Sequence, residues 1–202
     1  MRYDREHKAK TRDRILDVAA RAIRAAGPDK VAVAAVMSEA GLTHGGFYAH
    51  FPSKDALISA AVGRMFDDAA ARNAAVRAGP DTRVALSAYV DSYLSRIHRD
   101  APETGCPLPA LSAELSRLGP AARGALGEGL SRMTQGLAAQ LAELSPPPAD
   151  PIGIASSMIA EMVGAMALAR AVADPVQSDQ ILFNARAAVK TKAGLDPATR
   201  RP

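Results

Sequence analysis

Small and polar side chains gather between residues 43 and 54, and their chemistry suits contact with a nucleic acid. Thr43 and His44 carry hydrogen-bonding groups that can reach the edges of bases. Gly45 and Gly46 have no side chain, so the backbone at these positions can approach a ligand closely. The segment therefore predicts a surface on which few side chains read bases and the backbone lies near the ligand.

The residues that follow favour contacts with phosphate. Tyr48 and His50 can donate hydrogen bonds on either side of this surface. Lys54 stands at the start of an expected helix, whose N-terminal amides attract a phosphate. Phe47 and Phe51 are apolar at helical spacing, so we expect them to turn inward and anchor the segment.

Two short helices must position these residues. The pattern predicts a helix over residues 33–40 that ends at Gly41, and a second helix over 44–51. Two short helices joined by a tight turn that contains glycine form a helix-turn-helix unit, whose second helix enters the major groove of DNA. Such helix pairs also occur in ordinary helical bundles, where the aromatic residues are simply core.

Two segments resemble the TetR family of bacterial repressors. Leu42–Leu57 is similar, almost position for position, to that family's DNA-binding signature, and Thr11–Ala19 is similar to its first helix. The resemblance covers about residues 8–60. It implies an all-α regulator with a helical ligand-binding and dimerisation body. It also places six residues at the DNA: Thr43, His44, Gly45, Gly46, Tyr48 and, on a phosphate, Lys54. The Gly45-Gly46 pair departs from the larger side chains that many members carry.

The distribution of charge agrees with this interpretation. The net charge of the chain is +4. Residues 1–54 carry ten Lys and Arg against six Asp and Glu, whereas the remaining residues carry fifteen of each. A basic segment on a neutral body is typical of a polyanion-binding domain, although a charge of this size also falls within ordinary surface variation.

The rest of the chain predicts an all-α fold with about nine helices and no strand, because apolar residues recur at helical spacing throughout and aromatic residues make up only 4%. We expect a helix-turn-helix domain over residues 1–54, a connecting helix over 54–76 and a ligand-binding and dimerisation domain over 77–202. The further predicted helices span residues 8–26, 81–98, 107–118, 120–144, 151–172 and 176–192.

Apolar and aromatic residues of the middle helices predict an effector pocket. The candidate lining residues are Tyr89, Tyr93, Leu111, Glu114, Leu115, Met133, Leu137, Met158 and Met162. Several methionines and few aromatics favour a small or adaptable apolar ligand, but any one of these residues is more often plain core. Glu114 can bind a polar group of the ligand, or it can form a salt bridge with Arg117.

Cys106 is the only cysteine and stands directly before Pro107, at a predicted helix start. The positive end of a helix lowers the pKa of a thiol, which makes Cys106 a candidate sensor of oxidants or electrophiles, as in some TetR-like regulators. The alternative is a buried small apolar residue. The chain offers no second cysteine to resolve an oxidised thiol.

Other classes of function find no support in the sequence. It has no nucleophile elbow, no His-Glu-x-x-His, no Cys-x-x-Cys and no phosphate-binding loop, so we expect no enzyme, no cofactor and no metal site. The charged N-terminus is unlike a secretory signal, and Glu161 interrupts the longest apolar stretch, so we expect a cytoplasmic protein without a membrane partner. The expected partners are a palindromic operator in duplex DNA, a small-molecule effector that releases the repressor, and a second copy of the chain. The alternative is a helical protein-interaction module that does not bind DNA.

Overall fold

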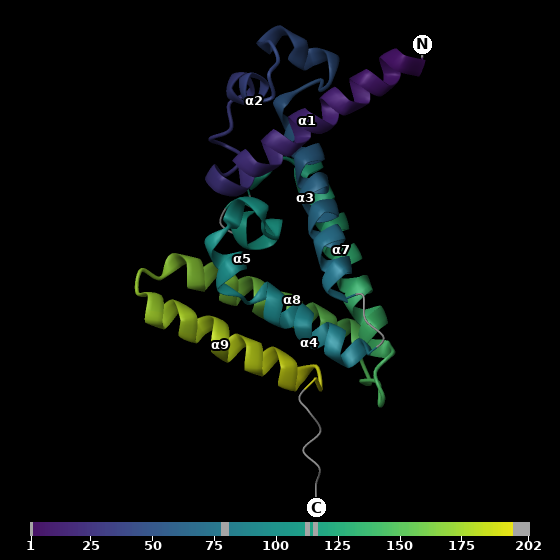
Figure 1. Cartoon of the computed structure of the whole chain (residues 1–202), viewed down its shortest axis with the longest axis vertical. Coiled ribbons are helices and arrows are strands. Elements are labelled where there is room, and N and C mark those ends of the chain that lie inside the picture. Colours follow the sequence, from purple (N-terminus) through teal and green to yellow (C-terminus); the bar gives the residue numbers. More distant parts are fainter. Residues whose placement is uncertain (1, 78–80, 112–113, 115–116, 196–202) are drawn as a thin grey trace, which may run out of the picture. The chain divides into compact units, whose positions relative to one another are not determined.

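The computed structural model describes residues 2–77, 81–111, 114 and 117–195, and within them the protein is all-α, as predicted. The described residues form nine α-helices and two 3₁₀ helices (Figure 1). In chain order these are α1 (Arg2–Ala26), α2 (Val33–Glu39), η1 (His44–Ala49), α3 (Lys54–Arg77), α4 (Thr82–Tyr93), α5 (Arg96–Asp100), η2 (Pro102–Thr104), α6 (Pro107–Leu111), α7 (Pro120–Ala142), α8 (Pro151–Ala171) and α9 (Pro175–Lys192).

The chain packs as two compact units. The first consists of residues 1–68 and 102–129, and the second of residues 69–101 and 130–202. Helices α3 and α7 each contribute residues to both units. These units are defined by packing alone and do not correspond to functional domains. The domain boundaries expected from the sequence, at residues 54 and 77, therefore stay a prediction.

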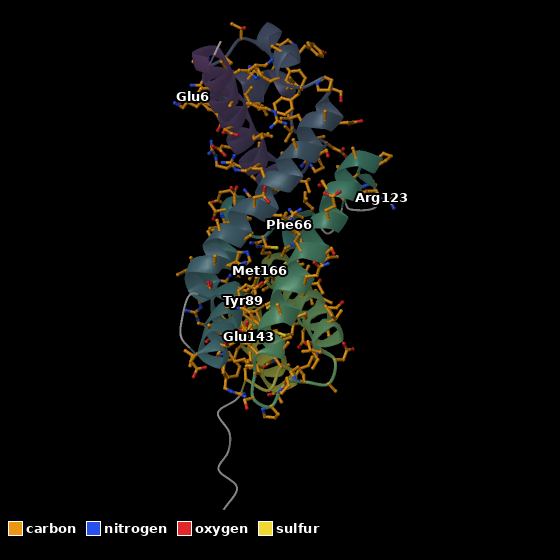
Figure 2. The ribbon with its side chains drawn as sticks, turned by 90° about the vertical axis from the view of Figure 1, so that its right-hand side faces the viewer. Glu6, Phe66, Tyr89, Arg123, Glu143 and Met166 are labelled. Atoms are coloured by element: carbon orange, nitrogen blue, oxygen red, sulfur yellow. The ribbon has the colours of Figure 1, made fainter. Side chains whose placement is uncertain are left out.

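The core of the first unit forms around α1, which contacts α2, η2 and α6. Its apolar face is buried as the helical spacing predicts, with Ile15 and Ile23 fully covered. The first unit also encloses the aromatic ring of Phe66 on α3, which is labelled in Figure 2. Gly129 of α7 lies against this ring, and a Cβ added there would overlap it.

Arg24 of α1 is buried, although the spacing of the apolar residues along this helix places it on the polar face. It is 5% exposed. Its guanidinium donates hydrogen bonds to the carbonyl oxygens of Met65, at 3.2 Å, and Glu103, at 3.3 Å, and lies 3.5 Å from a carboxylate oxygen of Asp68. Partners from distant parts of the sequence therefore make burial of this charge possible, and helical periodicity alone does not reveal them.

The core of the second unit is built on α8 and α9, which lie side by side (Figure 1). Helix α4 packs on α9, and α5 packs on α8. Tyr89 of α4 and Met166 of α8, both labelled in Figure 2, are buried in this unit. The buried Ser178 hydroxyl donates a 2.6 Å hydrogen bond to the Ala169 carbonyl oxygen, which joins the two helices near their connection.

The single helix predicted over residues 81–98 is wrong, because the chain breaks into α4 and α5. Leu94 leaves the helical region, at φ −91° and ψ 41°, and Ser95 caps the next helix by accepting a hydrogen bond from the amide of His98. The predicted helix over 107–118 is shorter than expected: α6 ends at Leu111, and Glu114 lies in a turn. Residues 112–113 and 115–116 of that prediction lie outside the described residues.

His98 is held in the second unit by its backbone neighbours. Its Nδ1 atom lies 2.6 Å from the carbonyl oxygen of Tyr93, and the two rings meet edge to face. Burial lowers the pKa of His98, and the positive charges of Arg170 and Arg72 lower it further, although the Tyr93 carbonyl opposes them. The folded protein therefore keeps this imidazole neutral to a lower pH than the unfolded chain does.

Among the described helices, only α8 is long and apolar enough to cross a membrane by length and composition. The core helices of soluble proteins pass the same test. Seven residues of α8 are buried against its neighbours, so packing within the second unit explains part of its apolar character, while other apolar residues of this helix are exposed.

Candidate DNA-binding interface

The turn between α2 and η1 is fixed by glycine. Gly41 has φ +69°, a left-handed conformation that strains any other L-residue except Asn and Asp. The Leu42 amide donates to the Met37 carbonyl oxygen and the Gly41 amide to the Ser38 carbonyl oxygen, both at 2.9 Å. This pair of bonds is the Schellman motif, which ends α2 and directs the chain into the second helix.

Buried aromatic rings anchor the second helix. Phe47 is 2% exposed and Phe51 is 1% exposed, as the sequence predicts, and their stacked rings lie 5.9 Å apart between centroids. The Arg12 guanidinium of α1 lies 4.8 Å from the centre of the Phe51 ring, an interaction that the sequence analysis did not identify. Arg12 lies near the middle of α1, and its sequence context gives no sign of this contact, because its partner is thirty-nine positions away.

The candidate base-reading residues and Tyr48, which is expected on a phosphate, face solvent. Thr43, His44 and Gly45 are exposed, and the Tyr48 side chain is 71% exposed, unlike its neighbour Phe47. Thr43 makes no side-chain cap on η1, which begins with a backbone hydrogen bond from the Gly46 amide to the Thr43 carbonyl oxygen. Its hydroxyl is therefore not used in capping the helix.

The two glycines of η1 have normal right-handed or extended backbone conformations, because neither has a positive φ. A Cβ at Gly45 meets no atom within 4 Å, and one at Gly46 makes only ordinary contacts with Met37 and Thr43, at 3.8 Å. The fold therefore does not require glycine at either position. A requirement for glycine at Gly45 would have to come from a bound partner.

Besides Tyr48, the two other residues expected on phosphates lie at the end of η1 and the start of α3. His50 is half-buried, and burial, followed by the charges of Lys8 and Arg12, lowers its pKa. Lys54 Nζ donates a 3.2 Å hydrogen bond to the carbonyl oxygen of Asp29. An ammonium group has three donors, so this bond leaves Lys54 able to contact a phosphate. The amide of Ala56 is capped by the Ser53 hydroxyl at 3.1 Å.

The predicted effector-pocket residues divide between the two packing units. Those of the second unit are Tyr89, Tyr93, Leu137, Met158 and Met162, all buried, and Met133, which is half-buried. Leu111 and Glu114 belong to the first unit, together with the DNA-binding residues, and Leu115 lies outside the described residues.

Cys106 directly precedes α6, as expected, and is 6% exposed. This helix has only five residues, so its dipole is weak compared with that of a long helix. Burial of the thiol agrees with a packing role.

Apolar side chains are exposed on the two last helices. Ile152 and Leu168 of α8 are 53% and 59% exposed, and Val176 and Phe183 of α9 are 74% and 61% exposed. Arg96 and Asp179 lie beside Phe183 in an open depression of about 330 Å³. Exposed apolar residues of this size on neighbouring helices are typical of a protein interface.

Comparison with known proteins agrees with this geometry. Residues 15–61 match the family described as bacterial regulatory proteins, tetR family, and residues 83–183 match the family described as tetracyclin repressor-like, C-terminal domain. A search of curated protein sequences finds no match.

Solved structures of the same fold cover nearly the whole chain. The reduced form of NemR from Escherichia coli has a TM-score of 0.78 at 24% identity, over 90% of this chain and 96% of its own. A TetR transcriptional regulator from Chloroflexus aurantiacus J-10-FL has a TM-score of 0.77 at 25% identity, with coverages of 92% and 95%. A TetR-family regulator from Cytophaga hutchinsonii has a TM-score of 0.78 at 24% identity, with coverages of 92% and 96%.

The helix-turn-helix and the all-helical remainder define a DNA-binding regulatory protein. The chain belongs to the TetR family and is a transcriptional regulator. Members of this family generally lack enzymatic activity, bind operator DNA and ligands, and form dimers. The first family match contains the Schellman turn, η1 and the start of α3.

Proposed function

We propose that this chain is a cytoplasmic, homodimeric repressor that binds a palindromic operator through η1 and releases it when a small molecule binds. The observation that carries the proposal is the pairing of buried and exposed residues on η1 and the residues that flank it. Phe47 and Phe51 fix η1 to the core, while Thr43, His44 and Tyr48 face solvent. A helix-turn-helix needs this arrangement for its second helix to enter the major groove.

The roles of the individual residues follow from their positions. Thr43 and His44 supply direct contacts with bases, and Gly45 and Gly46 let the backbone approach the DNA. Tyr48, His50 and Lys54 contact phosphates. In the free protein burial, followed by the charges of Lys8 and Arg12, lowers the pKa of His50, and a phosphate beside the ring would oppose this shift.

A selection of binding sequences from random DNA duplexes tests the proposal. A homodimer should select a palindrome whose half-sites lie about one helical turn apart. Affinity should fall steeply with salt, because phosphate contacts release counterions. A protein-interaction module would show no affinity for duplex DNA at any salt concentration.

Variants separate base reading from phosphate contact. Thr43→Ala and His44→Ala should reduce discrimination between the selected sequence and a mutated one, by about 1–3 kcal/mol for each lost base contact. Lys54→Ala should weaken binding to both sequences alike and lower the salt dependence. If His44→Ala leaves sequence preference intact, another residue reads the bases.

For the effector we propose a small molecule bound among Tyr89, Tyr93, Met133, Leu137, Met158 and Met162 of the second unit. Their apolar surface and polarisable sulfur atoms favour an apolar ligand. Substitution of Met162 by a larger residue should abolish release of the operator by an effector without changing the affinity for DNA.

We also propose Cys106 as a site of response to electrophiles. The supporting observations are its place directly before α6 and the similarity of fold to NemR, whose reduced form has been crystallised. Treatment with N-ethylmaleimide should release the operator from the wild-type protein and not from Cys106→Ser. Equal release from both proteins, or from neither, would leave Cys106 with its packing role alone.

A further inference from the structure

The start of α1 extends past the core of the first packing unit. Residues 6–10 are all exposed, and the first buried side chain along the described part of this helix is Thr11. This end of α1, purple in Figure 1, projects away from α2. An ion pair between Lys10 Nζ and Glu6, 2.9 Å apart, supports it locally (Glu6 is labelled in Figure 2). A helical segment without packing is marginal in water, so its presence points to a role for its exposed side chains.

Charges are distributed unequally around this part of α1. Lys8 and Arg12 lie four residues apart and therefore share one face of the helix. The ion pair described above lies on another face, and Asp13 lies 3.7 Å from the guanidinium of Arg64. Neither Lys8 nor Arg12 forms an ion pair with a residue that the structure describes. One face of the helix, the basic face of α1, thus presents two cations without a carboxylate partner in the described protein.

The basic face of α1 meets the end of η1. The Arg12 guanidinium lies 4.8 Å from the centre of the Phe51 ring, which directs this face toward the helix-turn-helix. Lys8 lies one turn further out on the same face. After burial, the charges of Lys8 and Arg12 are the causes that lower the pKa of His50, in agreement with both cations lying near that ring. The basic face therefore continues the surface on which His50 is proposed to contact a phosphate.

The backbone of duplex DNA has the charge and spacing that suit this face. Each strand carries one phosphate per about 3.4 Å of helix axis, whereas Lys8 and Arg12 are separated by about 6 Å along α1. Their long side chains can span this difference. Exposed cations beside a base-reading helix typically contact phosphates and fix the position of the protein on the duplex.

We propose that the basic face of α1 is a second phosphate-binding element, in which Lys8 and Arg12 contact the DNA backbone next to the phosphate bound by His50. The inference rests on the proposed function, because it needs η1 in the major groove. It extends the contact of each subunit beyond the helix-turn-helix and adds no sequence preference. A guanidinium stacked on a ring keeps its N–H donors for a phosphate, so Arg12 also joins this contact to the aromatic anchor of η1.

Ethylation interference tests the contact at single phosphates. The selected operator is ethylated at random phosphates, and duplexes that bind the protein are separated from those that do not. Wild-type protein should be blocked by ethylation at the phosphates of Lys54 and at a further group of phosphates assigned to α1. Lys8→Ala should lose its sensitivity at the further group and keep it at the phosphates of Lys54.

Lys10→Ala is the matched control. It removes the same charge from the same exposed segment, but residue 10 lies on the opposite side of α1 from residue 8. Its interference pattern should equal that of the wild type. Since both lysines are exposed, we expect neither change to alter Tm.

The dependence of affinity on salt gives the number of contacts. Lys8→Ala removes one phosphate contact per subunit, so for a dimer the slope of log K against log salt concentration should fall by about two. Affinity at 0.1 M salt should weaken roughly tenfold or more, alike for the selected and for a mutated sequence. Lys10→Ala should leave the slope unchanged. Arg12→Lys should also keep the slope, because the charge remains, whereas Arg12→Ala should lower it by about two.

The outcomes separate this inference from the proposed function. Equal interference patterns and equal salt slopes for Lys8→Ala and Lys10→Ala would overturn the inference, while operator binding by the wild type would still support the proposed function. A lower slope for Lys8→Ala with an unchanged interference pattern would also overturn it, because the charge would then act only at a distance. A wild-type protein without affinity for duplex DNA would contradict the proposed function together with the inference.

Discussion

Two glycines of the helix-turn-helix should respond oppositely to alanine. Gly41 has φ +69°, and a Cβ there meets no atom within 4 Å, so the cost of Gly41→Ala is purely conformational. An L-residue in the left-handed region costs about 1–2 kcal/mol. For a protein of this size that corresponds to a fall in Tm of about 2–8 °C. The Tm of Gly41→Asn should fall less than that of Gly41→Ala, because asparagine tolerates this conformation.

Gly45→Ala should instead leave the free protein as stable as the wild type or more stable. The position has no positive φ and no atom within 4 Å of an added Cβ, and Gly-to-Ala replacement at such a site stabilises by about 0.4–1 kcal/mol. Its effect should fall on the complex with the operator. A methyl group forced into a close contact with the DNA lowers the binding free energy by about 1–3 kcal/mol, which weakens affinity roughly five- to 150-fold.

The assays are thermal unfolding at one fixed protein concentration and fluorescence anisotropy with the selected operator. Gly41→Ala with an unchanged Tm would refute the argument from the Schellman turn. Gly45→Ala with unchanged operator affinity would show that the backbone of η1 does not approach the DNA closely. Loss of stability in Gly45→Ala would contradict the open space observed around this residue.

Three further predictions concern the two packing units. Below pH 6.5 the unfolded chain protonates His98 before the folded protein does, so Tm should fall more steeply with decreasing pH in the wild type than in His98→Asn. Arg24→Met leaves the buried partners of the guanidinium without their donor. It should lower the free energy of unfolding, measured with urea, by about 3–5 kcal/mol. Arg21 on the same helix is exposed, so Arg21→Met should lower the free energy of unfolding by less than about 1 kcal/mol. Phe183→Glu should give a monomer in sedimentation velocity, whereas Ile97→Glu, also exposed, should leave a dimer.

The recognition segment could be predicted from the sequence because its determinants are local. A glycine after a short apolar helix, and two phenylalanines four residues apart, act within one or two turns of the chain. The structure places Gly41 at the helix end and buries Phe47 and Phe51 for these reasons. The sequence signals of the helix-turn-helix thus lie within residues 33–51, although its aromatic anchor Phe51 also contacts Arg12 of α1.

Features that depend on distant partners were not predictable in this way. Periodicity assigned Arg24 to solvent, but carbonyl groups forty-one and seventy-nine positions away accept its hydrogen bonds. The break between α4 and α5 interrupts an apolar pattern that is continuous in the sequence, and it depends on a single serine cap. Glu114 was grouped with an apolar pocket because of its neighbours in the chain, whereas the structure places its carboxylate against Gly27.

The ion pairs of α3 restrict how a regulatory signal can act on the DNA-binding residues. One oxygen of Asp68 lies 2.8 Å from the Arg64 guanidinium, and the other lies 3.5 Å from that of Arg24. Arg64 also lies 2.6 Å from the Asp17 carboxylate of α1. Helices α1 and α3 are therefore joined through charged groups that are costly to separate, since one of them is buried. Since Phe47 and Phe51 in turn fix η1 to the same core, a movement of the first half of α3 must carry α1 and η1 with it. We infer that an effector changes the placement of an intact helix-turn-helix rather than its internal structure.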